Sequence, residues 1–223
     1  SIIRYRHEPG NPNSLTNNTV SRIGEDQQGI LWVATYGGGL NRFNPKTEVF
    51  TNYQHNPGDP QSLSNNNLWA VYIDTQQRIW VASERGLNRF NPALETFTVY
   101  QHDESNPDSL SSDTVTFIYE DHAGILLLGT FGGGLNRFDP QRESFTRYRY
   151  NPLDPHSLSS DIIMSICEDT TGSLWIGTYG GVDKLDPEEF QFGLYGNNIH
   201  SPNDLSNANV RSIFQDRDGT IWI

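Results

Sequence analysis

The sequence has a single cysteine among its 223 residues, and it is poor in basic side chains. One cysteine, Cys167, excludes an intrachain disulfide, so the fold must be held by packing and hydrogen bonds. Fifteen Lys and Arg against 27 Asp and Glu give a net charge of −12. Such a surface repels phosphates, so we expect no nucleic acid partner and no direct binding to an anionic membrane.

Long apolar stretches are also missing. No run is long enough to span a bilayer, and only 35% of residues are hydrophobic. Aromatic residues reach 12%, beside 20 Gly and 12 Pro. This mixture suits short strands joined by tight turns, with aromatic rings forming much of the core.

A repeat runs through the chain. A Ser-Leu pair followed by Ser or Thr recurs at Ser14, Ser62, Ser109 and Ser157, and Leu205-Ser206 begins a fifth unit. The spacing is 47 or 48 residues. Periods of this length are typical of propellers, kelch-like blades or helical repeats.

The segments inside each unit are short and rich in β-formers, which argues against helical repeats. Each unit is predicted to form four strands. In the first unit these are Val20–Glu25, Leu31–Thr35, Leu40–Phe43 and Val49–Gln54. In the second they are Leu68–Ile73, Ile79–Ser83, Leu87–Phe90 and Thr96–Gln101, and the third and fourth units start their strands at Val115 and Ile163.

We therefore predict an all-β fold, a β-propeller of four-stranded antiparallel blades, with about five repeats of about 48 residues. The expected blades are 14–61, 62–108, 109–156 and 157–203, with a partial blade made of 204–223 and 1–13. Residues 1–223 are then either one propeller domain with an incomplete fifth blade or a fragment of a larger ring. We favour the fragment, because an unfinished blade exposes a sheet edge.

Residues that recur in every unit or nearly every unit are interpreted as structural. Three such columns are the tryptophans Trp32, Trp80, Trp175 and Trp222, the tyrosines Tyr5, Tyr53, Tyr100, Tyr148 and Tyr195, and the aspartates Asp26, Asp74, Asp121, Asp169 and Asp216. The aromatic columns are expected in the core between blades. The aspartates are expected to cap turns, since one carboxylate per blade does not assemble a metal site. We accordingly predict no metal, no cofactor and no catalytic residue.

The pattern from Asp26 to Pro45 reads Asp-x-x-Gly-x-Leu-Trp-x-x-Thr-x-Gly-Gly-Gly-Leu-Asn-Arg-Phe-Asn-Pro, and it returns with substitutions from Asp121 to Pro140 and from Asp169 to Pro187. It resembles the two-component regulator propeller repeat. The resemblance implies a periplasmic or extracellular sensor domain of a bacterial inner-membrane receptor, coupled to a kinase or diguanylate cyclase output. It also implies seven-bladed propellers and ligands that are glycans or their breakdown products. This chain departs from that pattern in its blade count, and it contains neither membrane helix nor output domain.

Positions where the repeats differ are the candidate binding residues. The loop after the second strand begins with Tyr36 in the first unit and with Glu84-Arg85 in the second, and then with Phe131 and Tyr179. Trp69, near the start of a first strand, also differs from the residues at the equivalent position of the other units. We expect these six on one face, where aromatic rings stack on sugars and polar groups bind hydroxyls. The alternative is that the rings only close the central channel.

Three functions remain open. The favoured one is a sensor that recognises a glycan or similar small molecule. Self-association is left open, and we expect membrane attachment only through another part of the receptor. The second is a scaffold for a protein partner. The third, a propeller lyase or glycan-cleaving enzyme, is disfavoured because no second unusual carboxylate accompanies Glu84.

Overall fold

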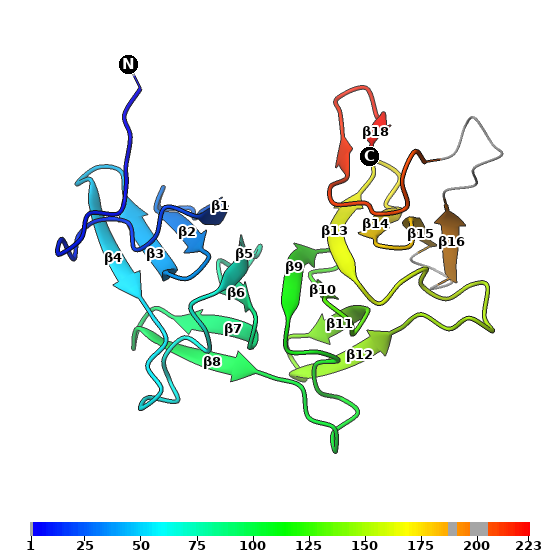
Figure 1. Ribbon diagram of the computed structural model, residues 1–223, viewed down its shortest axis with the longest axis horizontal. Coiled ribbons are helices and arrows are strands. Elements are labelled where there is room, and N and C mark those ends of the chain that lie inside the picture. The colour runs from blue at the N-terminus through cyan, green and yellow to red at the C-terminus, as the bar shows by residue number, and fades with distance from the viewer. Residues whose placement is uncertain (1, 187–190, 197–204) are drawn as a thin grey trace. The chain divides into compact units, whose positions relative to one another are not determined.

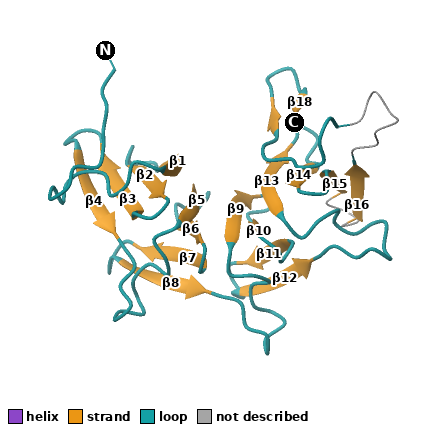
Figure 2. Ribbon diagram, viewed as in Figure 1, coloured by secondary structure: helices purple, strands orange, loops and turns teal. Residues whose placement is uncertain are grey.

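The computed structural model describes residues 2–186, 191–196 and 205–223. Every regular element in these ranges is a β-strand, as the strand colouring of Figure 2 shows. A search of the same ranges for a helix able to cross a bilayer finds none.

Four antiparallel sheets of four strands follow one another along the chain, and each is built from consecutive strands (Figure 1). The first two sheets are β1 (Val20–Glu25), β2 (Leu31–Thr35), β3 (Gly39–Asn44) and β4 (Val49–Tyr53), and β5 (Leu68–Ile73), β6 (Ile79–Ser83), β7 (Gly86–Asn91) and β8 (Thr96–Tyr100). The third is β9 (Val115–Glu120), β10 (Leu126–Thr130), β11 (Leu135–Asp139) and β12 (Ser144–Tyr148). The fourth is β13 (Ile163–Glu168), β14 (Leu174–Thr178), β15 (Val182–Asp186) and β16 (Gln191–Tyr195).

A fifth repeat contributes two paired strands, β17 (Phe214–Gln215) and β18 (Ile221–Trp222). The prediction of propeller blades with four complete repeats and an incomplete one is therefore confirmed. The predicted starts of first strands at Val20, Leu68, Val115 and Ile163 coincide with the observed ones.

The chain forms two compact units, which are described separately. One comprises Ser1–Gln101 with Asp113–Val115, and the other His102–Ser112 with Thr116–Ile223. The first unit thus contains the blades of β1–β4 and β5–β8. The second contains the blades of β9–β12 and β13–β16, except that Val115 at the start of β9 clusters with the first unit.

The recurring aspartate caps the first turn of each blade and, where the blade has the tryptophan, also accepts a hydrogen bond from its indole. In the first blade, Asp26 Oδ1 accepts hydrogen bonds from the backbone N–H of Gln28 and Ile30, each at 3.0 Å. Its other oxygen, Oδ2, accepts the indole N–H of Trp32 at 2.9 Å. Four blades contain this aspartate–tryptophan pair, at residues 26 and 32, 74 and 80, 169 and 175, and 216 and 222. The structural interpretation of the aspartate column is therefore confirmed.

The tyrosine column forms contacts between neighbouring blades. Tyr53 at the end of β4 packs on Phe90 and Phe97 of the next blade, with ring centroids 4.9 and 6.1 Å apart. Its hydroxyl donates to Glu95 Oε1 at 3.2 Å. Burial and the nearby Glu95 carboxylate together raise the pKa of Tyr53 to about 12. Tyr5 repeats the arrangement on the Phe pair of the first blade.

Some members of the two aromatic columns are not core residues. Trp32 and Trp80 are buried as predicted, but Trp222 is 61% exposed, and Tyr5 and Tyr195 are 40% and 52% exposed. The prediction was wrong for these three, because a repeat column becomes core only where a complete blade packs on each side of it.

A fourth column, of asparagines, ties each blade to the connection that precedes it. Asn41 on β3 accepts a hydrogen bond from Thr16 N–H at 2.9 Å and donates its amide to the Val33 carbonyl at 3.2 Å. Asn88 does the same with Ser64 and Val81. All three asparagines of this column, Asn41, Asn88 and Asn136, are fully buried. The amide thus satisfies a backbone donor and a backbone acceptor inside the blade.

In the fourth blade this position is Asp183, which is also fully buried. Its Oδ2 accepts hydrogen bonds from the Ser159 N–H and hydroxyl, both at 2.9 Å. Its Oδ1 has no hydrogen-bond partner in the described part of the chain. Burial raises the pKa of Asp183 to about 6, against the hydrogen bonds from Ser159 that lower it.

The glycine-rich turn after the second strand requires its glycines for space and for backbone conformation. Gly39 and Gly134 have φ of +81° and +76°, a region that disfavours side chains. A Cβ at Gly39 would lie 2.4 Å from the Tyr53 carbonyl oxygen, and one at Gly134 would lie 2.2 Å from the Tyr148 carbonyl oxygen. The turn therefore lies directly against the fourth strand.

Candidate functional site

A β-bulge near the start of the first strand marks the variable position of the blades. The pairing register shifts between Val20 and Arg22, between Leu68 and Ala70, and between Ile163 and Ser165. The residues at these shifts are Ser21, Trp69 and Met164, which differ from blade to blade. Because bulges redirect side chains and are common beside functional sites, the variable residues at this bulge are candidate positions for a binding site.

The turn after the second strand lies beside the connection that leads into the next blade. Tyr36 pairs with Asn67 in an isolated bridge, and the N–H groups of Gly37 and Gly39 both donate to the Asn66 carbonyl at 3.0 Å. The second unit repeats this with a bridge between Phe131 and Ile162. The two kinds of variable position, turn and strand start, therefore lie next to one another within each unit.

Three of the six predicted residues, Tyr36, Trp69 and Glu84, come together in the first unit, and Asn67 joins them. The Tyr36 hydroxyl donates to Glu84 Oε1 at 2.6 Å, and the Asn67 amide donates to Glu84 Oε2 at 2.7 Å. The Tyr36 and Trp69 rings meet edge to face, with centroids 5.9 Å apart and planes at 74°. We call Tyr36, Asn67, Trp69 and Glu84 the first candidate group.

The first candidate group is partly open to solvent. Tyr36 is 41% exposed, whereas Asn67, Trp69 and Glu84 are half-buried. The hydrogen bond to Glu84, reinforced by the charge of that carboxylate, raises the pKa of the Tyr36 hydroxyl. The indole N–H of Trp69 is buried and has no hydrogen-bond partner among the described residues.

Arg85 does not belong to this group. It lines a separate cavity of about 240 Å³, together with residues that include His55, Asp59 and Gln101. No ion pair joins Arg85 to Glu84 in the part of the chain that the structure describes. The two residues are adjacent in sequence but contribute to different surroundings.

The remaining two predicted residues meet in the second unit. Phe131 and Tyr179 begin the equivalent turns of consecutive blades, and their rings contact edge to face at 6.2 Å and 79°. Phe131 is 47% exposed and Tyr179 is half-buried. We call this pair the second candidate group. It has no charged side chain, whereas the first group contains Glu84. Both groups join the turn of one blade to the equivalent turn of the next.

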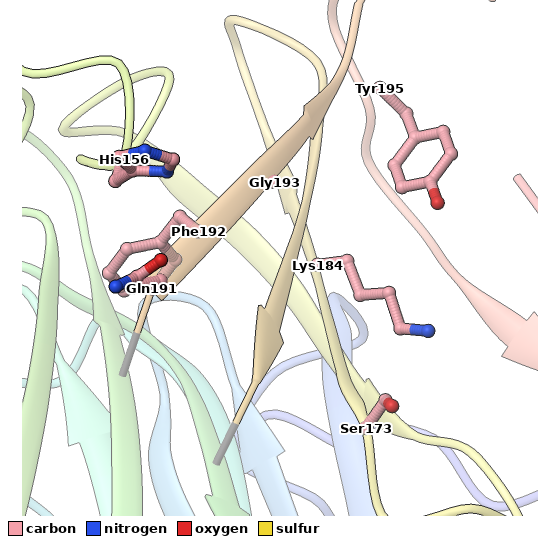
Figure 3. Close-up of a pocket in the computed structure, with 7 residues that line it drawn as sticks. All are labelled: His156, Ser173, Lys184, Gln191, Phe192, Gly193 and Tyr195. Atoms are coloured by element: carbon pink, nitrogen blue, oxygen red, sulfur yellow. The ribbon is translucent and has the colours of Figure 1, made fainter. Parts of the chain in front are cut away.

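A cavity of about 350 Å³, shown in Figure 3, lies on the outer part of the fourth blade. Its lining includes Lys184 on β15 and Gly193 and Tyr195 on β16. The corresponding face of the first blade carries Trp32 and Tyr53, which pack on Phe90 of the second blade. The cavity therefore lies on the face that, in the first blade, packs against the next blade. For this reason we do not assign the cavity to ligand binding.

The histidines and carboxylates do not gather into a metal site within the described ranges. His7, His55 and His102 each place Nδ1 within 2.8 Å of a backbone carbonyl oxygen, that of Leu15, Leu63 and Leu110 respectively. These three histidines thus serve the same structural contact in successive repeats.

Sequence reasoning missed Asn67 as a member of the first candidate group. It follows Asn65 and Asn66, and at its position the other repeats have Thr19, Thr114 and Ile162. The same search for deviations that found Glu84 could have found Asn67. The hydrogen bond that joins them could not be foreseen, because it links a turn to a connection 17 residues earlier.

The repeats match a family model described as two component regulator propeller, over residues 14–37, 62–85, 157–180 and 204–223. No curated protein sequence matches the chain.

Solved structures with the same fold include two extracellular domains from B. thetaiotaomicron. One, from a protein assigned as a hybrid two component system, is 25% identical with a TM-score of 0.72; the match covers 99% of this chain and 34% of that one. The other, assigned as a one component system, is 25% identical with a TM-score of 0.73, over 96% and 29%. This chain therefore spans about a third of the length of these relatives.

A more distant likeness is to a virginiamycin B lyase from Staphylococcus aureus, crystallised in a catalytically inactive form with quinupristin. It is 13% identical with a TM-score of 0.65, over 98% of this chain and 66% of the lyase. At that identity the similarity concerns the fold alone.

Proposed function

Because the repeats of this chain belong to the two component regulator propeller family, we propose that the chain is the ligand-recognising propeller of a bacterial signalling receptor. It lies on the periplasmic or extracellular side of the membrane in this proposal, and it has no catalytic activity of its own. Its relatives among solved structures are extracellular domains of regulators, and the net charge of −12 disfavours nucleic acid as a partner.

The observation that carries the proposal is the distribution of variation within a regular scaffold. Asparagine, aspartate and tyrosine columns repeat the same hydrogen bonds in successive blades. The bulge position instead carries Ser21, Trp69 or Met164, and the turn position carries Glu84 in one blade and an aromatic ring in the others. Exposed aromatic rings at the changing positions, Tyr36 and Phe131, are suited to stacking on the apolar face of a sugar ring. We therefore propose that each candidate group, taken by itself, is a contact site for a glycan or a similar small molecule.

A receptor built this way signals if the ligand binds one arrangement of its blades or of its assembled copies better than another. The ligand then shifts the population toward that arrangement by its difference in affinity. The output domain and its reaction belong to other parts of the receptor.

The experiment is a thermal-shift screen of the protein against oligosaccharides of differing monomers, with calorimetry on each hit. Ligand at 100 times its Kd stabilises the folded state by about 2.7 kcal/mol, enough for a clear rise in Tm. Trp69→Ala should reduce the rise for a ligand of the first candidate group, and Phe131→Ala should reduce it for a ligand of the second. The matched control Leu153→Ala removes an apolar side chain that is 91% exposed and lies outside both groups, and it should not.

Loss of affinity in the control as well as in the variants would contradict the placement of the site. A well-folded protein that responds to no oligosaccharide, but recovers a stoichiometric protein partner, would instead support a scaffold for protein–protein interaction.

A further inference from the structure

The first candidate group contains a carboxylate whose negative charge is not balanced by any cation in contact with it. Glu84 is half-buried, and both of its oxygens accept hydrogen bonds from neutral donors, Tyr36 and Asn67. Among the described residues, no Lys, Arg or His makes an ion pair with it. A partly desolvated carboxylate in this condition is stabilised further by any cation that reaches it.

Glu84 is also the exception at its position. The equivalent turn residues of the other complete blades are Tyr36, Phe131 and Tyr179, all of them aromatic. Repeat packing does not require a charge there, since Phe131 and Tyr179 make the corresponding contact through their rings. The charge of Glu84 is therefore not explained by the contact between the two blades.

Aromatic rings adjoin the carboxylate. Tyr36 contacts Glu84 through its hydroxyl and contacts the Trp69 ring edge to face at 5.9 Å. Tyr36 is accessible, with 41% of its surface exposed. A carboxylate beside tyrosine and tryptophan rings is the combination that attracts an ammonium group, by charge on one side and by the ring quadrupoles on the other.

We propose that the first candidate group binds the protonated amine of a ligand, with an amino sugar as the class that fits the proposed receptor. The inference rests on the proposed function, and it adds the charge of the ligand. The ammonium group lies against Glu84, and the rings of Tyr36 and Trp69 contact it or the adjoining sugar carbons. A net charge of −12 adds a long-range attraction for a cationic ligand and repels an anionic one.

The variant Glu84→Gln tests the charge while retaining the shape of the side chain and its capacity to accept from Tyr36. Its matched control is Glu95→Gln, which changes a second glutamate that accepts a tyrosine hydroxyl, that of Tyr53. The probes are glucosamine, N-acetylglucosamine and glucose, titrated by calorimetry at low and moderate salt. Glucosamine is protonated at neutral pH, whereas its acetylated form is neutral.

We expect glucosamine to bind the unaltered protein more tightly than either neutral sugar. Glu84→Gln should weaken glucosamine binding roughly ten- to hundredfold, the loss typical of one hydrogen bond to a charged group. Glu95→Gln should leave the affinity unchanged. Added salt should weaken glucosamine binding and have little effect on glucose.

A second readout locates the ligand independently of affinity. The indole N–H of Trp69 gives one of five tryptophan signals in a ¹H–¹⁵N spectrum, identified by its loss in Trp69→Phe. Glucosamine should shift that signal in the unaltered protein and not in Glu84→Gln.

Equal binding of the three sugars, with either Phe131→Ala or Trp69→Ala still weakening it, would overturn the amine inference and leave the proposed function standing. Glucosamine binding that is unaffected by Glu84→Gln would overturn it as well. Absence of binding by all three sugars, with no shift of the Trp69 signal, would also overturn the amine inference. The proposed function would be contradicted separately, by failure of the wider oligosaccharide screen.

Discussion

We expect Asp183 to make the stability of the fourth blade depend on pH. In the asparagine column, the side-chain amide donates to a carbonyl of the second strand, as Asn41 does to Val33 and Asn88 to Val81. Asp183 pairs in register with Ile176, so the equivalent acceptor is the Ile176 carbonyl. Only the protonated carboxylic acid can supply a donor there, and the ionised form leaves a buried oxygen without a partner.

The size and sign of the effect follow from the pKa. Burial raises the pKa of Asp183 from 3.8 to about 6. The folded state therefore holds the proton more tightly than the unfolded state. Its stabilising contribution is complete below pH 3.8 and is lost as the pH rises through about 6. A difference of about two pKa units corresponds to about 3 kcal/mol of unfolding free energy.

The substitution Asp183→Asn should remove this dependence. At pH 7.5 we expect the variant to be more stable than the unaltered protein by about 3 kcal/mol, which is a rise in Tm of roughly 6–12 °C for a chain of this size. Near pH 4 the two proteins should be nearly equal. The assay is chemical and thermal unfolding, followed by tryptophan fluorescence across this pH range.

The converse substitution is the control. Asn88→Asp places the same buried carboxyl in the second blade, where it should create a loss of stability with rising pH that the unaltered blade lacks. A constant difference between Asp183→Asn and the unaltered protein at all pH values would refute the reasoning, because it would show that the ionisation of Asp183 is not linked to folding.

Three further outcomes are expected. Asp169→Ala removes hydrogen bonds to two backbone N–H groups and to the Trp175 indole, and should lower the unfolding free energy by about 2–3 kcal/mol in denaturant titrations. Burial opposes the ionisation of Asp169, but these hydrogen bonds and the one from the Thr171 hydroxyl outweigh burial and lower the pKa of Asp169 to about 2. The stabilisation by the ionised carboxylate should therefore be present above pH 3.8 and be lost as the pH falls toward 2. In thermal unfolding, Gly134→Ala should lower the Tm more than Gly132→Ala. Both glycines have positive φ, but only a Cβ at Gly134 would collide with the backbone. Equal losses of Tm would contradict this explanation. Tyr36→Phe removes one donor to Glu84, and should weaken glucosamine binding less than Glu84→Gln does in the same calorimetric titration.

Much of the fold was predictable because every repeat has the same pattern of strand and turn residues. Four copies of one strand and turn order allow each boundary to be checked against its equivalents, and the starts of the first strands at Val20, Leu68, Val115 and Ile163 were placed correctly. The aspartate turns were also foreseen, since Asp and Gly at fixed spacing have a direct conformational meaning. The bond from Asp26 to the Trp32 indole was not, because it depends on how two neighbouring strands place side chains across a turn.

The candidate site was predictable only in part. Deviation between repeats identified Tyr36, Trp69 and Glu84, which do meet, but it also selected Arg85, which lines a different cavity. Adjacent residues at a turn have different surroundings, and sequence alone does not say which of them faces the next blade. Asp183 shows the same limit, because its deviation from asparagine is visible in the sequence whereas its burial is not.

Hydrogen–deuterium exchange with a saturating ligand from the oligosaccharide screen tests the central claim most directly. The account predicts slower exchange in the turns and strand starts that carry the candidate groups, residues 36–39, 67–70 and 84–86 in the first unit or 131–134 and 179–181 in the second. Protection confined to the outer strands β4, β8 and β12, with these turns unchanged, would contradict it.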